Sequence, residues 1–458
     1  MAGNLRLVLV RAGSVLLAAA LVGCAGEGQP TASPAPSPTQ AAGTLPPQGP
    51  ISPTSPPIAG ATASPELSPG AATSPSPAGT GAGPAAATGS PWQYLAGFPG
   101  EGAIEVSSVT GTPTGFVAVG YQPMPGDGYY GRRRGIVWRS ADGIAWERVE
   151  PAEFEFASLD QVVLLNDQLY AFGTVSACDF VIDDACTDIA EAGWTVWRSS
   201  DGLAWSRLPQ SPALKAADLD GVIVGPNLLV AHGSTGDEQA AVVWLSADGQ
   251  TWEETRELAG LDPIGAMASG AHGFAAIGAH FVPSLDDIEA VAAYSTDGRT
   301  FQPAQLPGSL PVAFRGVAAA HAGYVAVGYA DREDQPLMAA AIVSADGQTW
   351  SAAPAQDGFT NLGFHHVSAV PSGYLAIGFV PEADSFDRQL GSTWFTADGL
   401  SWARAGDLQG GAYQELGGAA VSGAGMVIFA TDFEDEGDEE VISTIRPWFA
   451  ALDRLAGP

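Results

Sequence analysis

The chain has 458 residues, with 50 Asp and Glu against 18 Lys and Arg, which gives a formal net charge of −32 and a pI near 4.2. A protein that binds nucleic acid needs a cationic face to displace counterions from phosphates, so this charge excludes nucleic acid as a partner. The length allows a large core, either as one repeat domain or as two ordinary domains.

Residues 1–24 are predicted to be an export leader. Arg6 and Arg11 precede an apolar run at 15–22, which is shorter than the roughly 18–20 residues of a membrane-spanning helix. The run ends in Leu21-Val22-Gly23-Cys24, which resembles the lipobox of bacterial lipoproteins. The resemblance implies that Cys24 is lipidated, becomes the first residue of the mature chain, and anchors it to the outer face of the cell membrane. The alternative is an ordinary signal peptide with a chance cysteine.

Residues 25–91 are predicted to be a disordered tether. They hold 16 of the 35 prolines, no aromatic residue and no Lys or Arg. Such a segment has too little to bury to offset the entropy of folding. We expect it to hold the folded part, residues 92–458, away from the bilayer.

Two short motifs repeat through residues 92–458. The first has Ser or Thr, any residue, Asp and Gly, with Trp or Phe three positions after the Gly, and we call it the turn motif. Its aspartates are Asp142, Asp201, Asp248, Asp297, Asp346 and Asp398. The second is a six-residue apolar run such as 115–120, which precedes each turn motif and occurs a seventh time at 425–430. Seven units are therefore predicted.

Each unit consists of short apolar runs separated by turn residues, at a period of about 50 residues. This pattern predicts an all-β fold, a seven-bladed β-propeller of four-stranded antiparallel blades over residues 92–458. The turn-motif residues suit a structural role, because Asp accepts hydrogen bonds from turn N–H groups, Gly adopts positive φ, and Trp packs between blades.

The turn motif resembles the Asp box (BNR repeat) of sialidases and of photosystem assembly-factor propellers. The resemblance implies that each motif joins the third and fourth strands of a blade. It is specific for the fold and does not specify an activity.

The ends of the chain indicate how the ring closes. Residues 447–454 parallel 392–399 of the sixth unit, and then the chain stops, so the seventh blade lacks its outer strand. Residues 92–96 resemble an outer strand that has no blade of its own. We therefore expect the N-terminal strand to complete blade seven and cover two sheet edges.

Cys178 and Cys186 are separated by seven residues within one insertion. An exported protein permits a disulfide, so we predict one that joins the two sides of a hairpin. The alternative, a metal-binding cysteine pair, lacks neighbouring histidines.

The innermost strands should line a central channel. Equivalent positions carry Ser107, Asp160, Asp220, Gly265, Arg315, His365 and Gly417. Asp160, Asp220, Arg315 and His365 are candidate ligand-binding residues at the channel mouth, and the alternative is a water-filled lining. His365 and His366 point to opposite faces of a strand, so we expect no metal site, and nothing in the sequence implies a cofactor.

Two features of the loops each have two interpretations. Tyr129, Tyr130, Arg132, Arg133 and Arg134 could hold a carboxylate, a sulfate or a sugar, or the cations could pair with nearby acidic loops. Acidic loops near 286–289, 331–334, 382–387 and 432–440 could bind cations or a basic partner, or could be solvated surface.

These features favour a membrane-anchored, monomeric binding or assembly module for a glycan or a protein ligand. The alternative is an extracellular glycoside hydrolase with Asp160 and Asp220 as its two carboxylates. The Arg-Ile-Pro signature of sialidases is absent, so sialidase activity is not expected. A third class is a structural spacer of the cell envelope.

Overall fold

The computed structural model describes residues 90–99, 105–124, 132–182, 185–235, 240–256, 258, 264–282, 287–332, 335–381, 389–409, 413, 415–435 and 441–455. The predicted leader and residues 25–89 of the predicted tether lie outside these ranges. Among the described residues, no helix has the length and apolar character needed to cross a membrane.

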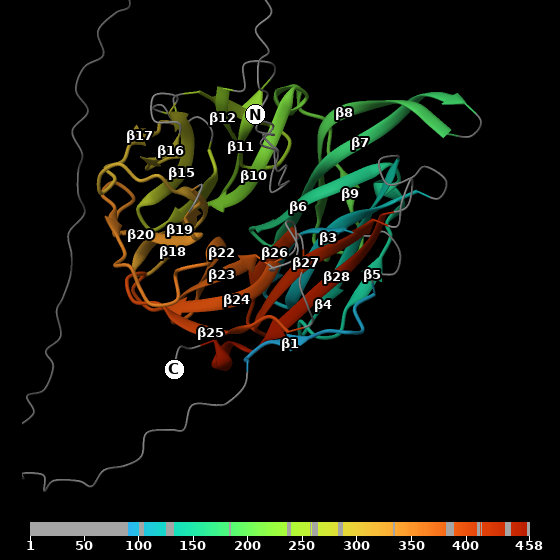
Figure 1. The fold of residues 1–458 in the computed structure, drawn as a ribbon. Coiled ribbons are helices and arrows are strands. Elements are labelled where there is room, and N and C mark those ends of the chain that lie inside the picture. Colours follow the sequence, from blue (N-terminus) through green and yellow to red (C-terminus); the bar gives the residue numbers. More distant parts are fainter. Residues whose placement is uncertain are drawn as a thin grey trace, which may run out of the picture. The chain divides into compact units, whose positions relative to one another are not determined.

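Within these ranges the strands form seven four-stranded antiparallel sheets (Figure 1). Blade 1 contains β2 (Glu105–Thr112), β3 (Gly115–Pro123), β4 (Arg133–Ser140) and β5 (Glu147–Val149). Blade 2 contains β6 (Ala157–Leu165), β7 (Gln168–Ile182), β8 (Ala185–Ser199) and β9 (Ser206–Arg207). Blade 3 contains β10 (Ala217–Gly225), β11 (Leu228–Thr235), β12 (Ala240–Ser246) and β13 (Glu253–Thr255). Blade 4 contains β14 (Ala266–Gly270), β15 (Gly273–Val282), β16 (Asp287–Ser295) and β17 (Gln302–Pro303).

The remaining three blades follow the same order. Blade 5 contains β18 (Ala313–Ala320), β19 (Gly323–Ala330), β20 (Met338–Ser344) and β21 (Ser351–Ala352). Blade 6 contains β22 (Gly363–Val370), β23 (Gly373–Pro381), β24 (Gln389–Thr396) and β25 (Ala403–Asp407). Blade 7 contains β26 (Glu415–Val421), β27 (Met426–Asp435), β28 (Val441–Ala450) and β1 (Gln93–Tyr94). The helical structure in the described residues is limited to short 3-10 segments such as η1 (Ala152–Phe154) and η2 (Pro212–Leu214).

The seven sheets form a closed ring. Each innermost strand contacts the innermost strand of the next blade, and β26 of blade 7 contacts β2 of blade 1. Seven buried hydrophobic clusters lie one at each interface between neighbouring blades. At the junction of blades 7 and 1, for example, the Trp146 and Phe429 rings lie 5.2 Å apart. The prediction of a closed seven-bladed propeller is confirmed.

The six turn motifs share one hydrogen-bond pattern. In blade 1 the backbone N–H groups of Ile144 and Ala145 each donate to Asp142 Oδ1 at 2.8 Å, and Gly143 N–H donates to Ser140 Oγ at 2.8 Å. Gly143 has a φ of +77°, a conformation that favours glycine. Trp146 Nε1 then donates to the Gly143 carbonyl at 3.1 Å, which holds the indole against its own turn.

The N-terminal strand completes blade 7. In β1, Gln93 pairs with Phe449 and Tyr94 pairs with Trp448 of β28, and Figure 1 shows β1 beside β28. Leu95 N–H adds a 3.0 Å bond to the Pro447 carbonyl. The prediction that the N-terminal strand closes the ring is therefore confirmed, although regular pairing covers only two residues.

The segment around β1 contacts three blades. Trp92 is 5% exposed, and its Nε1 donates to Thr393 Oγ1 of blade 6 at 2.7 Å. Phe98 packs against Trp138 of blade 1, with ring centroids 5.6 Å apart, and against Phe429 of blade 7 at 5.1 Å. A short strand is sufficient here because side chains on both sides of it are anchored in neighbouring blades.

The hairpin formed by β7 and β8 carries both remaining cysteines. Its register pairs Cys178 with Ile189 and Cys186 with Val181, so the two cysteines are not opposite each other. The side chains of this part of the hairpin lie outside the described residues. The structure therefore does not support the predicted disulfide.

Candidate functional site

A β-bulge recurs in the innermost strand of six blades. The strand register shifts across one residue in each, and these residues are Ser107, Asp160, Asp220, Arg315, His365 and Gly417. In blade 4 the equivalent Gly265 lies just before β14 and donates its N–H to the Ile277 carbonyl at 2.7 Å. Together with Gly265 these are the seven positions that the sequence marks as equivalent, and six of the seven are extra residues in their strands. A bulge turns its side chain away from the regular alternation of the strand.

Glycines on the second strand make room for these bulges. A Cβ atom at Gly120 would lie 1.8 Å from the Glu105 carbonyl oxygen, and one at Gly173 would lie 2.0 Å from the Ser158 carbonyl oxygen. Gly233 in blade 3 has the same relation to the Asp218 carbonyl, at 1.9 Å. In blade 3, residues 228–233 therefore occupy the place in the strand register that 115–120 occupy in blade 1. This is one position later than the sequence motif at 227–232.

A pocket of about 760 Å³ lies where the innermost strands of blades 7, 1, 2 and 3 meet, and we call it the channel-mouth pocket. It brings together the bulge residues Ser107, Asp160, Asp220 and Gly417. Its other charged lining residues are Glu105, Asp218, Glu415, Arg133 and Lys215. The lining therefore holds five carboxyl groups and two basic groups.

Side chains from one blade hold the backbone of the next at this pocket. Ser108 Oγ of blade 1 accepts a 3.2 Å hydrogen bond from Val162 N–H of blade 2. Gln161 Oε1 of blade 2 accepts a 2.5 Å bond from Val222 N–H of blade 3, and Gln161 Nε2 lies 3.4 Å from the Asp220 carbonyl. These bonds fix the relative positions of the strands that carry Asp160 and Asp220.

Arg133 occupies the blade 1 side of the pocket. Its guanidinium carbon lies 4.2 Å from the centroid of the Tyr121 ring, and Nη1 donates to Ser158 Oγ at 3.3 Å. The Tyr121 hydroxyl in turn donates to Glu105. The Oγ atom of Ser107, which also lines the pocket, is buried and has no hydrogen-bond partner among the described residues.

Asp220 differs chemically from an ordinary surface carboxylate. Burial, and secondly the negative charge of Asp218 on the same strand, raise its pKa from 3.8 to about 7. Asp220 is therefore partly protonated near neutral pH. A carboxyl group of this kind can donate a hydrogen bond or a proton, and it can lose its proton when a cation binds nearby.

Arg315 and His365 do not line this pocket and form a separate cluster in blades 5 and 6. The Arg315 guanidinium lies 5.4 Å from the Tyr329 ring, and its Nη2 donates to the Tyr329 hydroxyl at 3.2 Å. His365 lies 4.1 Å from the Phe379 ring and 5.9 Å from that of Tyr329. Burial, then the charges of Arg315 and His366, lower the pKa of His365 to about 3, so its ring is neutral at physiological pH.

Three consecutive arginines, Arg132 just before β4 and Arg133 and Arg134 within it, have different partners. Arg134 lies 3.7 Å from Glu150 and 3.9 Å from Glu155, so it pairs with acidic neighbours. Arg132 lies 5.6 Å from the Phe156 ring. Of the three arginines, Arg133 is the one that lines the channel-mouth pocket.

Parts of the loop predictions fall outside the described residues. Tyr129 and Tyr130 do so, as do residue 286 and residues 333–334, 382–387 and 436–440 of the acidic loops. In the described part of the chain, no group of three or more His, Cys, Asp or Glu side chains could hold a metal ion.

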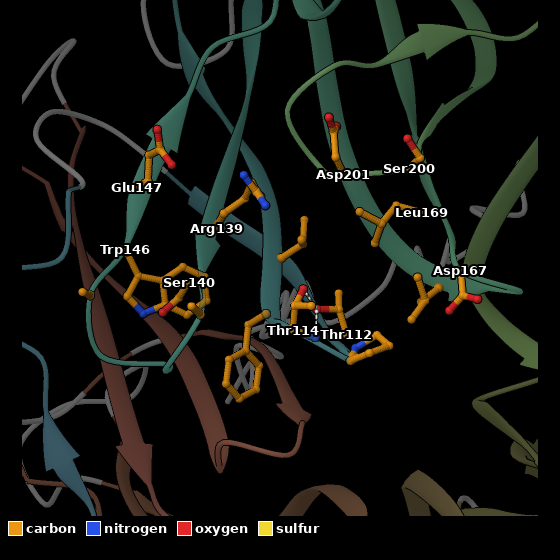
Figure 2. Close-up of a pocket in the computed structure, with 16 residues that line it drawn as sticks. Thr112, Thr114, Arg139, Ser140, Trp146, Glu147, Asp167, Leu169, Ser200 and Asp201 are labelled. Atoms are coloured by element: carbon orange, nitrogen blue, oxygen red, sulfur yellow. Dashed lines mark hydrogen bonds between the residues drawn. The ribbon is translucent and has the colours of Figure 1, made fainter.

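A second hollow of about 790 Å³ lies between blades 1 and 2, near the turn motifs (Figure 2). Arg139 and Glu147 of blade 1 line it, as do Asp167 and Asp201 of blade 2. Asp201 Oδ1 already accepts hydrogen bonds from Leu203 and Ala204 N–H, at 2.8 and 3.0 Å. Because this carboxylate is satisfied by its own turn, the hollow is a weaker candidate site than the channel-mouth pocket.

Several acidic residues of the pocket are not among the residues predicted from the sequence. Glu105, Asp218 and Glu415 each stand two positions before a bulge residue. All three line the same pocket as the bulge residues, so an acidic residue two positions before a bulge is the signal that could have identified them. Trp194 and Gln161 also line the pocket, and no sequence pattern singles them out.

No family model and no curated protein matches the sequence. Among solved structures, the fold is similar to YCF48 bound to D1 peptide, with a TM-score of 0.48, 11% identity, and coverage of 80% of this chain and 97% of that one. It is also similar to Trypanosoma rangeli sialidase in complex with the inhibitor DANA, with a TM-score of 0.37, 13% identity, and coverage of 75% of this chain and 55% of that one. At such low TM-scores and identities, these likenesses carry no information on function.

Proposed function

We propose that this protein is a β-propeller that binds a glycan or protein ligand in the channel-mouth pocket. The observation that supports this proposal most is the convergence of Ser107, Asp160, Asp220 and Gly417, the bulge residues of four blades, in one pocket of about 760 Å³. Pockets of roughly 300–1,000 Å³ with a few convergent polar groups are typical of ligand sites. The hydrogen bonds between blades keep this arrangement in place before a ligand arrives.

Arrays of glycans and peptides, probed with the full chain, test the proposal. We expect retention of a ligand class that stays intact, and weaker retention in Asp160→Asn and Asp220→Asn. Asp357→Asn serves as the control, because Asp357 is exposed and does not line the pocket. Retention that neither pocket variant alters would place the site elsewhere and contradict the proposal.

A glycoside hydrolase is the second candidate function. The observation that favours it is the pKa of about 7 for Asp220, caused by burial and by Asp218, beside Asp160 in one pocket. A carboxyl group that stays protonated near neutral pH suits a general acid, and a second carboxylate suits a nucleophile or base. Released sugar products, lost in Asp160→Asn and in Asp220→Asn but retained in Asp357→Asn, would establish this activity.

We also propose that residues 1–24 are a lipoprotein leader and that Cys24 carries the lipid, with residues 25–91 as the tether. The support is the Leu21-Val22-Gly23-Cys24 sequence after a charged and apolar leader. Replacing Cys24 by Ser should prevent incorporation of labelled fatty acid and move the protein out of the membrane fraction. Continued labelling of the Cys24→Ser protein would refute the proposal.

The disulfide between Cys178 and Cys186 remains a proposal that rests on export and on cysteine spacing. Since the register sets the two residues apart along the hairpin, the bond would require that register to change. Mass spectrometry of the unreduced, exported chain would show a linked peptide pair if the bond forms, and two free thiols if it does not.

A further inference from the structure

We propose that the channel-mouth pocket binds the guanidinium group of an arginine side chain, presented by a peptide segment of a partner protein. This inference deepens the proposed binding function and rests on it. It assigns the class of ligand from the charges and ring faces of the pocket wall.

The charge of the lining selects a cation. Five carboxyl groups, those of Glu105, Asp160, Asp218, Asp220 and Glu415, line one pocket with only two basic residues, Arg133 and Lys215. Attraction between unlike charges is stronger at a partly buried site than in bulk water. An anionic ligand would meet a surplus of carboxyl groups and is excluded.

The arrangement favours an organic cation over a metal ion. Among the described residues, the carboxyl groups do not form a cluster of three that could hold a metal. They are distributed over the walls of a pocket of about 760 Å³, which suits a group that forms several separate hydrogen bonds.

The protein's own Arg133 shows that the pocket accommodates a guanidinium. This group lies 4.2 Å from the centroid of the Tyr121 ring of blade 1 and donates to Ser158 Oγ of blade 2. Asp160 of blade 2, the pair Asp218 and Asp220 of blade 3, and Trp194 of blade 2 line the same pocket. Carboxyl groups and aromatic rings in the wall of one pocket are a combination that binds a planar guanidinium better than a compact ammonium.

Calorimetric titration of the full chain tests the inference. The probes are acetyl-Gly-Arg-Gly-amide and the same peptide with citrulline, which has the shape of arginine without its charge. We expect the arginine peptide to bind at least about tenfold more tightly than the citrulline peptide. We also expect Asp160→Asn and Asp220→Asn each to weaken its binding at least about fivefold, while Asp357→Asn leaves it unchanged.

Equal binding of the two peptides, or no detectable binding of either, would overturn the inference. So would tighter binding of glucosamine than of the arginine peptide, because that result would assign the pocket to amino sugars. The circular dichroism spectrum and unfolding midpoint of each variant identify loss of fold. Retention of an uncharged array ligand that depends on Asp160 would refute this inference and leave the proposed binding function intact.

Discussion

Trp92 Nε1 donates a 2.7 Å hydrogen bond to Thr393 Oγ1, a residue 301 positions later in the chain. The indole lies in the core between blades 6 and 7, although the strand that it precedes belongs to blade 7. Closure of the ring therefore depends on side chains as well as on the short ladder between β1 and β28.

Replacing Trp92 by Ala should lower the free energy of unfolding by about 3–5 kcal/mol, because it empties a buried site and removes the bond to Thr393. Trp92→Phe, which keeps most of the ring, should cost about 1–2 kcal/mol. Denaturant unfolding measures both values. A loss below about 0.5 kcal/mol in Trp92→Ala would mean that this side chain does not hold the ring closed.

Loss of a turn-motif carboxylate should be destabilising. Asp248 Oδ1 accepts bonds from Gln250 and Thr251 N–H, both at 2.8 Å. We expect Asp248→Ala to lower the free energy of unfolding by about 1–2 kcal/mol. Asp357→Ala, at an exposed position outside the turn motifs, is the control and should stay within about 0.5 kcal/mol of the wild type in the same urea titration. Equal effects in the two variants would contradict a structural role for Asp248.

The turn motifs should also make the protein sensitive to acid. Backbone N–H donors hold the pKa of each of the six aspartates below 3.8. A lowered folded-state pKa contributes stability above pH 3.8, and that contribution is lost as the pH falls through the folded-state value. Acid titrations followed by tryptophan fluorescence should show a shallower loss of stability below pH 4 when Asp201 and Asp248 are both replaced by Asn. An unchanged slope would contradict this explanation.

Adding a side chain on the strand that pairs with a bulge should disturb the pocket. In Gly173→Ala the new Cβ would lie 2.0 Å from the Ser158 carbonyl oxygen, so the strands must separate. We expect a loss of about 1–3 kcal/mol in the free energy of unfolding and weaker ligand binding. Gly97→Ala is the control, because nothing lies within 4 Å of its Cβ position. Binding by Gly173→Ala at wild-type strength would show that the bulge does not shape the site.

Stability should also respond to the ionisation of Asp220. Its folded-state pKa of about 7 lies above the ordinary 3.8, so folding takes up a proton between these values, and ionisation at higher pH opposes folding. Asp218 and Lys215 from its own segment and Asp160 from β6 share the pocket with it. Asp220→Asn should therefore stabilise the protein at pH 8, on the order of 2 kcal/mol, and by less at pH 4. Thermal unfolding at both values measures the difference, and equal effects at the two pH values would refute the assignment.

The sequence was sufficient to predict the number of blades and the closing strand. The repeated Asp-Gly pairs follow from the chemistry of local turns, and the unmatched segments at 92–96 and 447–454 follow from counting the repeats. Both can be recognised in the sequence without a structure. It was also sufficient to identify the equivalent channel positions, because a bulge at the same place in each blade keeps the spacing to the next motif nearly constant.

The composition of the site could not be predicted as well. Asp160 and Asp220 meet in one pocket, whereas Arg315 and His365 lie in a separate aromatic cluster, and equivalence around a ring does not indicate which neighbours are close enough to share a ligand. Arg133 illustrates the same difficulty. Its position over Tyr121 depends on the pairing of β3 with β4 and on contact with blade 2.

The placement of β1 has a mechanical consequence. A pull on the chain before Ser90 enters the ring at the one blade whose strands come from both ends of the sequence. The ladder there is two residues long, so the load passes to Trp92, Leu95 and Phe98, which are wedged among blades 6, 7 and 1. Shear resistance at this seam therefore resides in buried side chains, and rupture at the seam would open the circle while leaving six blades fully paired.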